Sequence, residues 1–516
     1  MPSVSALTQF SNGVLPDTAI NITVDTVTPA RDITFGTTGN RSVTLNGGTL
    51  FLEGDTGTTL MTWRGGSTTA PVTINSNINY SNSDATASAT FRVINAFNRP
   101  LTFNGDITIS GTGARPMQIT SNNVITVNGS NAADFLSLGG TGEFIAGSNT
   151  AFGAGAVQKT NTSTVSLRSD VTITGGASSY SWLQSNITAG LRISELAAST
   201  ADRTLTMDSR LVGNVGGNSI LQFLENINST GNLILELKYD AATVQNIALA
   251  TNATGIVRFA QIGDTTFGSV ISGGGQLEKN GGTGTTTLTE VNTYTGKTTI
   301  GAGTLLLAVG GSIADSSEIN LGTAGSQGAL DVTAKASFSF GAGQTVSGFG
   351  TINIGTGKTA SVAGNLNPGN SPGQVNVTGN LAMESTTATT MELAGSGGVA
   401  GTDFDNVNVT RNLGYDGTLS IVSFGGFDIY QAGTYGLFDF ASQSGNFDAV
   451  SFGGNAMAFG SGIWSGSTGG YNYSLTLANG DLVVGAIPEP GTASLLLGGL
   501  ALALLGRRKR SSLRSC

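Results

Sequence analysis

Short runs of β-branched and apolar residues, separated by glycine, asparagine, aspartate or serine, recur along almost the whole chain and limit what it can fold into. Most of these runs alternate apolar with polar side chains, which is the pattern of a β-strand with one buried face. We predict strands at 20–27, 42–52, 72–78, 101–109, 124–127, 164–167, 171–174 and 233–238. No stretch before residue 486 has the periodicity of a long helix, although we expect short helical turns at 193–198 and 240–250. The pattern predicts an all-β protein.

The composition favours strands over disorder. Charged residues make up 11% of the chain, against about 25% in a typical soluble protein, and 77 of the 516 residues are glycine. Low charge with abundant Thr, Ser, Asn, Val and Ile is typical of strands joined by Gly/Asn turns. The formal net charge is −9. Because no basic patch lies outside the C-terminal tail, we expect no nucleic acid partner.

The strand pattern continues over hundreds of residues without a domain boundary, which favours a β-solenoid over a sandwich or a barrel. The segment 271–307 is the most regular: ISGGGQLEKNGGTGTTTLTEVNTYTGKTTIGAGTLLL. We predict strands there around 276–279, 285–289, 297–300 and 304–307. Alternation predicts that one set of side chains stacks in the core and another faces water; the inward set is Leu277, Leu288, Ile300 and Leu305, and the outward set is Thr287, Thr289 and Thr299.

This segment closely resembles the autotransporter-associated β-strand repeat. The match runs through Gly275, Leu277, Lys279, Gly281, Gly284, Thr287, Leu288, Asn292, Tyr294, Thr295, Gly296, Thr298, Gly303, Thr304 and Leu305. The resemblance implies a right-handed parallel β-helix of the kind found in surface and passenger proteins. Degenerate echoes of the repeat occur at 33–52 and 101–111.

The region after the repeat also has a familiar layout. The motif PGNSPG at 368–373, flanked by strand-like runs at 346–354 and 402–409, resembles a region that often follows such repeats in surface proteins. Its Pro-Gly corners suit tight turns between coils. We expect closing strands at 433–440 and 471–484 that protect the end of the stack from edge-to-edge pairing.

The C-terminal tail has three parts in order: Pro488, Glu489 and Pro490, then an uncharged apolar run at 491–506, then Arg507, Arg508, Lys509 and Arg510. As a helix the apolar run would be roughly 24 Å long, somewhat short for a bilayer core of about 30 Å. To span the core, the helix would have to include residues before it, and the arginines after it would extend their side chains to the membrane surface. The basic cluster would stay cytoplasmic. The other interpretation is a buried core helix followed by a solvated basic end.

The three-part order closely resembles the PEP-CTERM sorting signal. That resemblance implies an exosortase-type membrane enzyme as a partner, removal of the tail, and a surface or extracellular-matrix destination. An exported protein should also begin with a signal peptide, and residues 1–15 show neither a basic start nor an apolar core. We expect the signal peptide upstream of Met1, the other reading being a truncated or mis-started chain.

Few groups in the chain could carry chemistry. It contains no histidine, which excludes Ser-His-Asp triads, His-ligated zinc and histidine bases, and the one cysteine, Cys516, lies in the tail. The best carboxylate pair is Asp403 and Asp405, two residues apart on a predicted strand and so on one face. Such a pair could serve as acid and base in a glycosidase or lyase. Two solvated carboxylates at the start of a strand are the favoured interpretation.

The glycine-rich stretch 281–289 fits the GGxGxDxLx frame of calcium-binding β-rolls, except that Thr286 occupies the aspartate position. Without that carboxylate a calcium ion has no charged ligand. We therefore predict no metal site, no cofactor and no catalytic residue.

Together these patterns predict a right-handed parallel β-helix with a single C-terminal membrane helix. We expect a degenerate solenoid at 1–267, the repeat at 268–308, continued solenoid with a cap at 309–485, and the sorting signal at 486–510. The predicted function is that of an exported structural or adhesive surface protein that contacts extracellular polysaccharide. The alternative is an extracellular polysaccharide-degrading enzyme on the same scaffold.

Overall fold

The structure is a computed structural model of the chain. It describes residues 7–11, 20–23, 32–36, 42–54, 59–64, 70–82, 91–95, 99–111, 116–153, 155–160, 164–184, 191–195, 200–211, 220–224, 230–239, 246–249, 254–369 and 371–487. Every regular element among these residues is a β-strand. The predicted all-β class is therefore confirmed.

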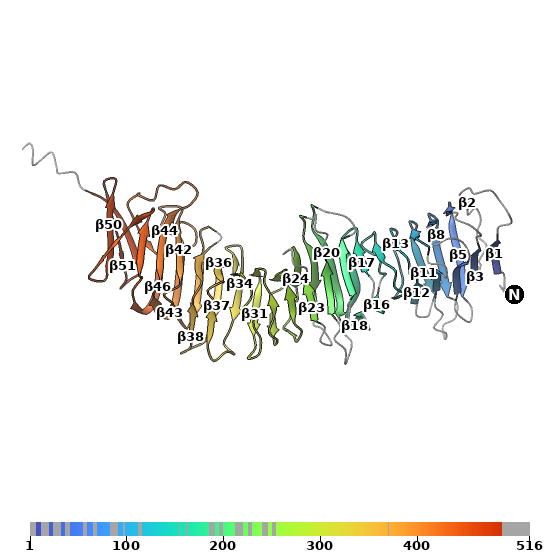
Figure 1. The fold of residues 1–516 in the computed structure, drawn as a ribbon, viewed down its shortest axis with the longest axis horizontal. Helices are drawn as coiled ribbons and strands as arrows, with labels where there is room; N and C mark the ends of the chain where they lie inside the picture. Colours follow the sequence, from blue (N-terminus) through green and yellow to red (C-terminus); the bar gives the residue numbers. More distant parts are fainter. Residues whose placement is uncertain are drawn as a thin grey trace, which may run out of the picture.

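The strands stack as successive turns of an elongated, β-helix-like coil. A strand pairs with one that lies two or three strands further along the chain, and nearly all of these pairs are parallel. For example, β4 (Val43–Asn46) pairs with β7 (Val72–Ile74), and β7 pairs with β10 (Leu101–Phe103). Figure 1 shows the result: sequence order follows the long axis of the molecule.

A single hydrophobic core runs through the stack because inward residues fall in register from coil to coil. One such row is Leu45, Ile74, Phe103, Val127, Ala146 and Leu167. None of these side chains is more than 2% exposed. Burial of one large aliphatic or aromatic side chain contributes about 1.5–3 kcal/mol to stability. Each coil is therefore stabilised by the side chains that it buries against its neighbours.

The most regular segment folds as predicted. The four predicted strands are β27 (Gln276–Lys279), β28 (Thr285–Leu288), β30 (Thr298–Ile300) and β31 (Gly303–Leu307), and the segment also holds two short strands that were not predicted, β26 (Ile271–Gly273) and β29 (Thr293–Tyr294). β27 pairs with β30 and β28 with β31, both parallel. The predicted inward residues Leu277, Leu288, Ile300 and Leu305 are all fully buried. The predicted outward threonines are partly exposed, so the expected alternation is confirmed.

Three of the predicted strands are each two strands in the structure, joined by a corner. The run 42–52 divides into β4 and β5 (Thr49–Gly54) at Gly47 and Gly48, which have φ of 76° and 33°. Glycine adopts this left-handed region readily, so the chain can turn there without strain. The runs 72–78 and 101–109 also divide at a corner, before β8 (Asn77–Asn82) and β11 (Ile107–Gly111), but without glycines of positive φ. The prediction missed these corners because buried residues stand on both sides of each one.

The predicted helical turns are wrong wherever the structure describes them. Residues of 193–198 belong in part to β19 (Leu191–Glu195), and residues of 240–250 in part to β23 (Asn246–Leu249). Both strands pair in parallel with β21 (Ile220–Leu224). Pairing within the stack overrides the weak local preference for helix.

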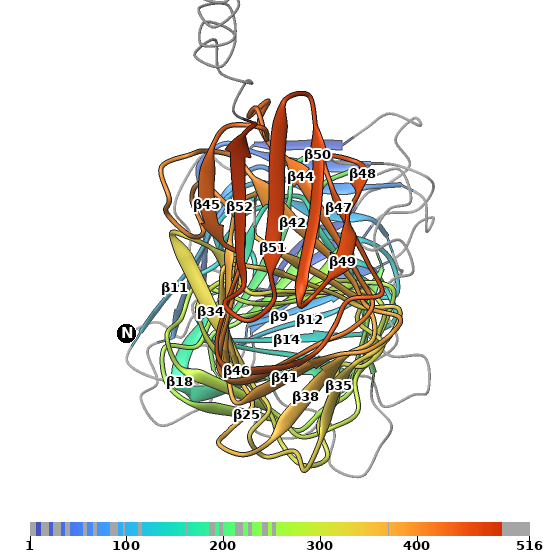
Figure 2. The ribbon, with the colours of Figure 1, turned by 90° about the vertical axis from the view of Figure 1, so that its left-hand side faces the viewer.

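At the C-terminal end the chain changes to antiparallel pairing. Five strands form this sheet in the order β45 (Gly433–Gly436), β52 (Asp481–Ala486), β51 (Tyr471–Thr476), β50 (Ile463–Thr468) and β49 (Ala458–Gly460). Figure 2 shows it standing across the end of the coils. It packs on the last coils through Tyr473, whose ring centroid lies 4.5 Å from that of Phe452. Strands are thus present in both predicted closing segments.

Among the described residues, none lies in a helix long and apolar enough to cross a membrane. The predicted membrane helix, Pro488, Glu489 and Pro490, and the basic cluster at 507–510 lie outside the described residues.

Candidate functional site

A ladder of asparagines runs along the outside of the N-terminal coils. Asn46, Asn75, Asn104 and Asn128 each follow the last inward residue of a stacked strand, and neighbouring side chains bond to one another. Each later amide donates its Nδ2–H to Oδ1 of the one before it, and every distance is 2.7 Å. The result is a continuous polar stripe on the outer surface.

Sequence reasoning missed this ladder, although the signal is present. The four asparagines end the related tetrapeptides VTLN, VTIN, LTFN and ITVN. A search for one short motif with variable spacing would have aligned the four coils.

A second ladder lies further along, on the outer face of β22 (Leu233–Leu237), β24 (Gly255–Phe259) and β27. Arg258 lies in register between Glu236 and Glu278. Its Nε donates to Glu278 at 2.7 Å, and one of its terminal nitrogens lies 3.5 Å from Glu236. Arg258 bridges the two carboxylates and partly offsets their charge, so this ladder holds three neighbouring strands in register.

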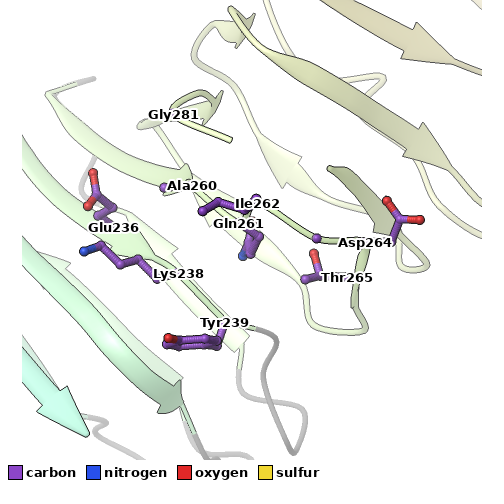
Figure 3. A pocket seen from close by; sticks show the side chains of 10 residues that line it. Glu236, Lys238, Tyr239, Ala260, Gln261, Ile262, Asp264, Thr265 and Gly281 are labelled. Carbon is purple, nitrogen blue, oxygen red and sulfur yellow. The ribbon is translucent and has the colours of Figure 1, made fainter. Parts of the chain in front are cut away.

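Beside this ladder lies a groove with a volume of about 610 Å³. We call it the tyrosine groove. It is lined by Glu236, Lys238, Tyr239, Gly281 and the segment 260–265. In Figure 3 the ring of Tyr239 lies at the end of β22, with Lys238 and Glu236 on the same side of the groove. Ile262 is 80% exposed. The groove therefore offers an aromatic ring, an aliphatic side chain and charges of both signs.

Two polar residues of the tyrosine groove already serve the fold. The Asp264 carboxylate accepts the backbone N–H of Thr285 at 2.8 Å. The buried Gln261 carboxamide accepts the hydroxyl of Thr286 at 3.4 Å. Within the described residues, a ligand in the groove could contact Lys238, Tyr239 and the exposed side of Glu236. Such a surface can hydrogen-bond sugar hydroxyls and pack against a sugar ring.

A buried lysine supports the turn that forms one edge of this groove. Lys279 is fully buried, and its Nζ donates to the carbonyl of Gly282 at 2.7 Å. Burial lowers the pKa of this amine, because a low-polarity environment disfavours the charged form. The lysine belongs to the strand β27, and its bond closes the turn that follows.

Asp403 and Asp405 do not form the predicted pair on one strand. Both precede β43 (Asn406–Tyr415), and their partners differ. Asp403 accepts the N–H of Val399 at 2.8 Å and holds the turn before it. Asp405 is 1% exposed, and its two oxygens accept the N–H groups of Gly373 and Glu392 at 2.7 and 2.8 Å.

Asp405 thus ties the PGNSPG segment to the neighbouring coil. Burial raises the pKa of Asp405 to about 7, although the hydrogen bonds from Gly373 and Glu392 oppose that rise. Because each oxygen already has a backbone donor, the carboxyl group is a structural element. Because Asp405 is buried, the interpretation of two solvated carboxylates is wrong for this residue, and the two aspartates do not form an exposed acid and base pair.

The calcium frame also has a structural role. Thr286 is fully buried, so the position where a calcium-binding roll needs a carboxylate points into the core. Within the described residues no group of three or more His, Cys, Asp or Glu side chains could hold a metal ion.

No protein-family model matches this chain, and no curated protein is significantly similar to it in sequence.

Proposed function

We propose that this protein is an exported structural and adhesive element of the cell surface or extracellular matrix. The observation that supports it best is the register of polar side chains on the outside of a long parallel stack, above all the asparagine ladder. A rod of this kind repeats the same hydrogen-bonding groups at the strand spacing of about 4.8 Å. That is a suitable surface for an extended polysaccharide.

The finer features of the proposal follow from the sequence. The coil would be a right-handed β-helix, since parallel crossover connections are overwhelmingly right-handed. Pro488, Glu489 and Pro490 would be the recognition segment for an exosortase-type membrane enzyme. The run 491–506 would be a transient membrane helix, with Arg507, Arg508, Lys509 and Arg510 as its cytoplasmic stop.

The export half of the proposal can be tested in a bacterial host that carries an exosortase. The chain would bear an epitope before residue 487, and its C-terminus would be mapped by mass spectrometry in the surface and membrane fractions. We expect the surface form to lack the tail. Replacing Pro488, Glu489 and Pro490 by alanine should leave the tail attached and the protein in the membrane fraction.

Replacement of Ser511 and Ser512 by alanine, beyond the basic cluster, is the matched control and should change nothing. The proposal of sorting fails if the alanine variant is processed like the unmodified chain. It also fails if deletion of the exosortase has no effect on where the protein accumulates.

The adhesive half predicts binding through the tyrosine groove. We expect Tyr239→Ala to weaken retention of the protein on a neutral polysaccharide matrix, because the ring supplies the main apolar contact surface there. Thr299→Ala, on the outer face of a neighbouring strand, is the control. Equal retention of both variants would show that the tyrosine groove does not bind the polysaccharide.

A further inference from the structure

A second groove lies further along the chain, on the outer face of the C-terminal coils. It has a volume of about 360 Å³ and crosses β31, β34 (Ser326–Asp331), β37 (Gly350–Asn353), β40 (Gln374–Thr378) and the middle of β43. We call it the threonine groove. The lining residues that matter are Thr304, Asp331, Asn353, Thr378, Thr410 and Arg411.

A β-bulge places the cation of this groove. Buried and exposed residues alternate along most of β43, but Thr410 and Arg411 are both exposed. The register against β46 (Phe438–Gly445) shifts between Val409 and Asn412, where Thr410 and Arg411 stand opposite the single residue Ala441. Bulges re-aim side chains in this way and are frequent beside binding sites. Here the bulge turns Arg411 outward at one end of the groove.

The one carboxylate in the groove is already saturated. Oδ1 of Asp331 accepts the N–H and the hydroxyl of Thr333 at 2.9 and 2.6 Å, and Oδ2 accepts Nδ2 of Asn353 at 2.8 Å. In the part of the chain that the structure describes, the ion pairs involve Arg258 and Lys297, and none involves Arg411. Within the described residues the Arg411 guanidinium therefore has no carboxylate at ion-pair distance, and the oxygens of Asp331 are occupied by neutral donors.

Neutral polar groups fill the space between Asp331 and Arg411. Asn353 accepts the hydroxyl of Thr378 at 2.6 Å, and Thr410 accepts the N–H of Gly379 at 3.0 Å. Gly379 has φ of 126°, and a Cβ there would lie 2.9 Å from the carbonyl oxygen of Gly355, so the floor must stay free of side chains at this point. Hydroxyl and amide groups thus recur from strand to strand, about 4.8 Å apart.

We propose that the threonine groove binds an acidic polysaccharide, with a uronate carboxylate on Arg411 and sugar hydroxyls on the threonine and asparagine side chains. An arginine fork recognises a carboxylate through two parallel hydrogen bonds. Polar groups repeated at the strand spacing can contact successive units of an extended glycan. The inference rests on the adhesive part of the proposed function and adds to it the chemical class of the ligand.

The test uses the full chain in a mild non-ionic detergent and isothermal titration calorimetry with tetragalacturonic acid and its methyl ester. We expect the acid to bind more tightly than the ester. Arg411→Gln should weaken binding of the acid about ten- to a hundredfold, the effect of losing a hydrogen bond to a charged group. The same variant should bind acid and ester alike, and Arg411→Lys should retain part of the preference.

Arg92→Gln is the matched control, because Arg92 is an exposed arginine outside the threonine groove, the tyrosine groove and the asparagine ladder. It should leave binding of the acid unchanged. The circular dichroism melting curve of Arg411→Gln should match that of the unmodified chain, since the side chain is exposed.

Three results would overturn the inference: no binding of tetragalacturonic acid, equal affinity for acid and ester, or equal weakening by Arg411→Gln and Arg92→Gln. None of these results would affect the outcome of the export test. Retention on a neutral polysaccharide through Tyr239 would also stand, so the adhesive proposal and the acidic-ligand inference can fail separately.

Discussion

At the scale of the residue, the ionisable side chains that matter most are the buried ones. Asp405 and Lys279 both lie inside the stack, and each bonds to backbone atoms of a turn. A buried charge is costly unless it is well paired. These two residues therefore couple the stability of particular turns to pH.

For Asp405 we predict a loss of stability with rising pH. Its pKa is about 7 in the folded state against 3.8 ordinarily. The folded state thus holds the proton more tightly, and the contribution is full below about pH 4 and lost as pH rises to about 7. The slope is at most about 1.4 kcal/mol per pH unit. Urea unfolding at several pH values should show it.

Asp405→Asn should flatten that slope and lower stability near pH 4, where Asp405 is protonated and its contribution is full. Its amide nitrogen would face one of the two backbone donors, and the lost hydrogen bond costs about 1–3 kcal/mol. Asp403→Asn is the control, because Asp403 is partly exposed. An unchanged slope in Asp405→Asn would show that another group titrates in this range.

For Lys279 the sign is opposite. Burial lowers its pKa in the folded state, so the unfolded chain binds the proton more tightly, and stability rises with pH toward the ordinary range of lysine. Lys279→Met removes a buried charge, whose desolvation costs several kcal/mol, and one hydrogen bond worth about 1 kcal/mol. We expect chemical denaturation to find the variant at least as stable as the unmodified chain.

The control is Lys297→Met, which removes a partly exposed ion pair with Glu318 at 3.0 Å. Such pairs contribute about 0–1 kcal/mol. Marked destabilisation by Lys279→Met would mean that closing the turn at Gly282 matters more than the buried charge.

At the scale of the element, the strands are held in register by side-chain ladders as well as by the backbone. Asn75 has both roles within the asparagine ladder: it donates to Asn46 and accepts from Asn104. It lies directly after β7, whose backbone pairs with strands on both sides.

Asn75→Ala should therefore cost about 1–2 kcal/mol, the value of two side-chain hydrogen bonds at about 0.5–1.5 kcal/mol each with partial recovery by water. Thermal unfolding of the variant measures the loss. Thr73→Ala changes an outward residue of the same strand outside the ladder and is the comparison. If the two variants were equally stable, the ladder would order the surface without stabilising it.

Strand content was predictable from the sequence and the corners were not, whereas the asparagine ladder was missed although its four tetrapeptides are visible. Alternation located β27, β28, β30 and β31 because each has one buried face. It could not show that Gly47 and Gly48 end one sheet and begin another, since inward residues flank both. The bulge at Thr410 and Arg411 was equally hidden, because it exists only relative to the partner strand β46.

At the scale of the whole molecule, each coil contacts mainly the coils before and after it. Stability in such an architecture is close to a sum over coils and the interfaces between them. The C-terminal antiparallel sheet is the exception, because it covers the last coils instead of extending the stack.

A chain that spans 254–487 should consequently fold without the N-terminal coils and unfold cooperatively, as judged by circular dichroism. A chain that spans 254–432 should instead associate or unfold. It lacks the antiparallel sheet and the last strands, so apolar side chains such as Tyr415 and Val407 would be uncovered. Monomeric folding of the shorter chain in sedimentation experiments would contradict this role of the terminal sheet.

The parallel pairing along the axis also sets how the rod responds to pulling. The backbone hydrogen bonds between coils point along the long axis of the molecule (Figure 1). A load applied between the two ends therefore opens one interface at a time, as in peeling, rather than shearing many bonds together. A surface rod built in this way would lengthen stepwise under flow, with each released coil absorbing work before the next one yields.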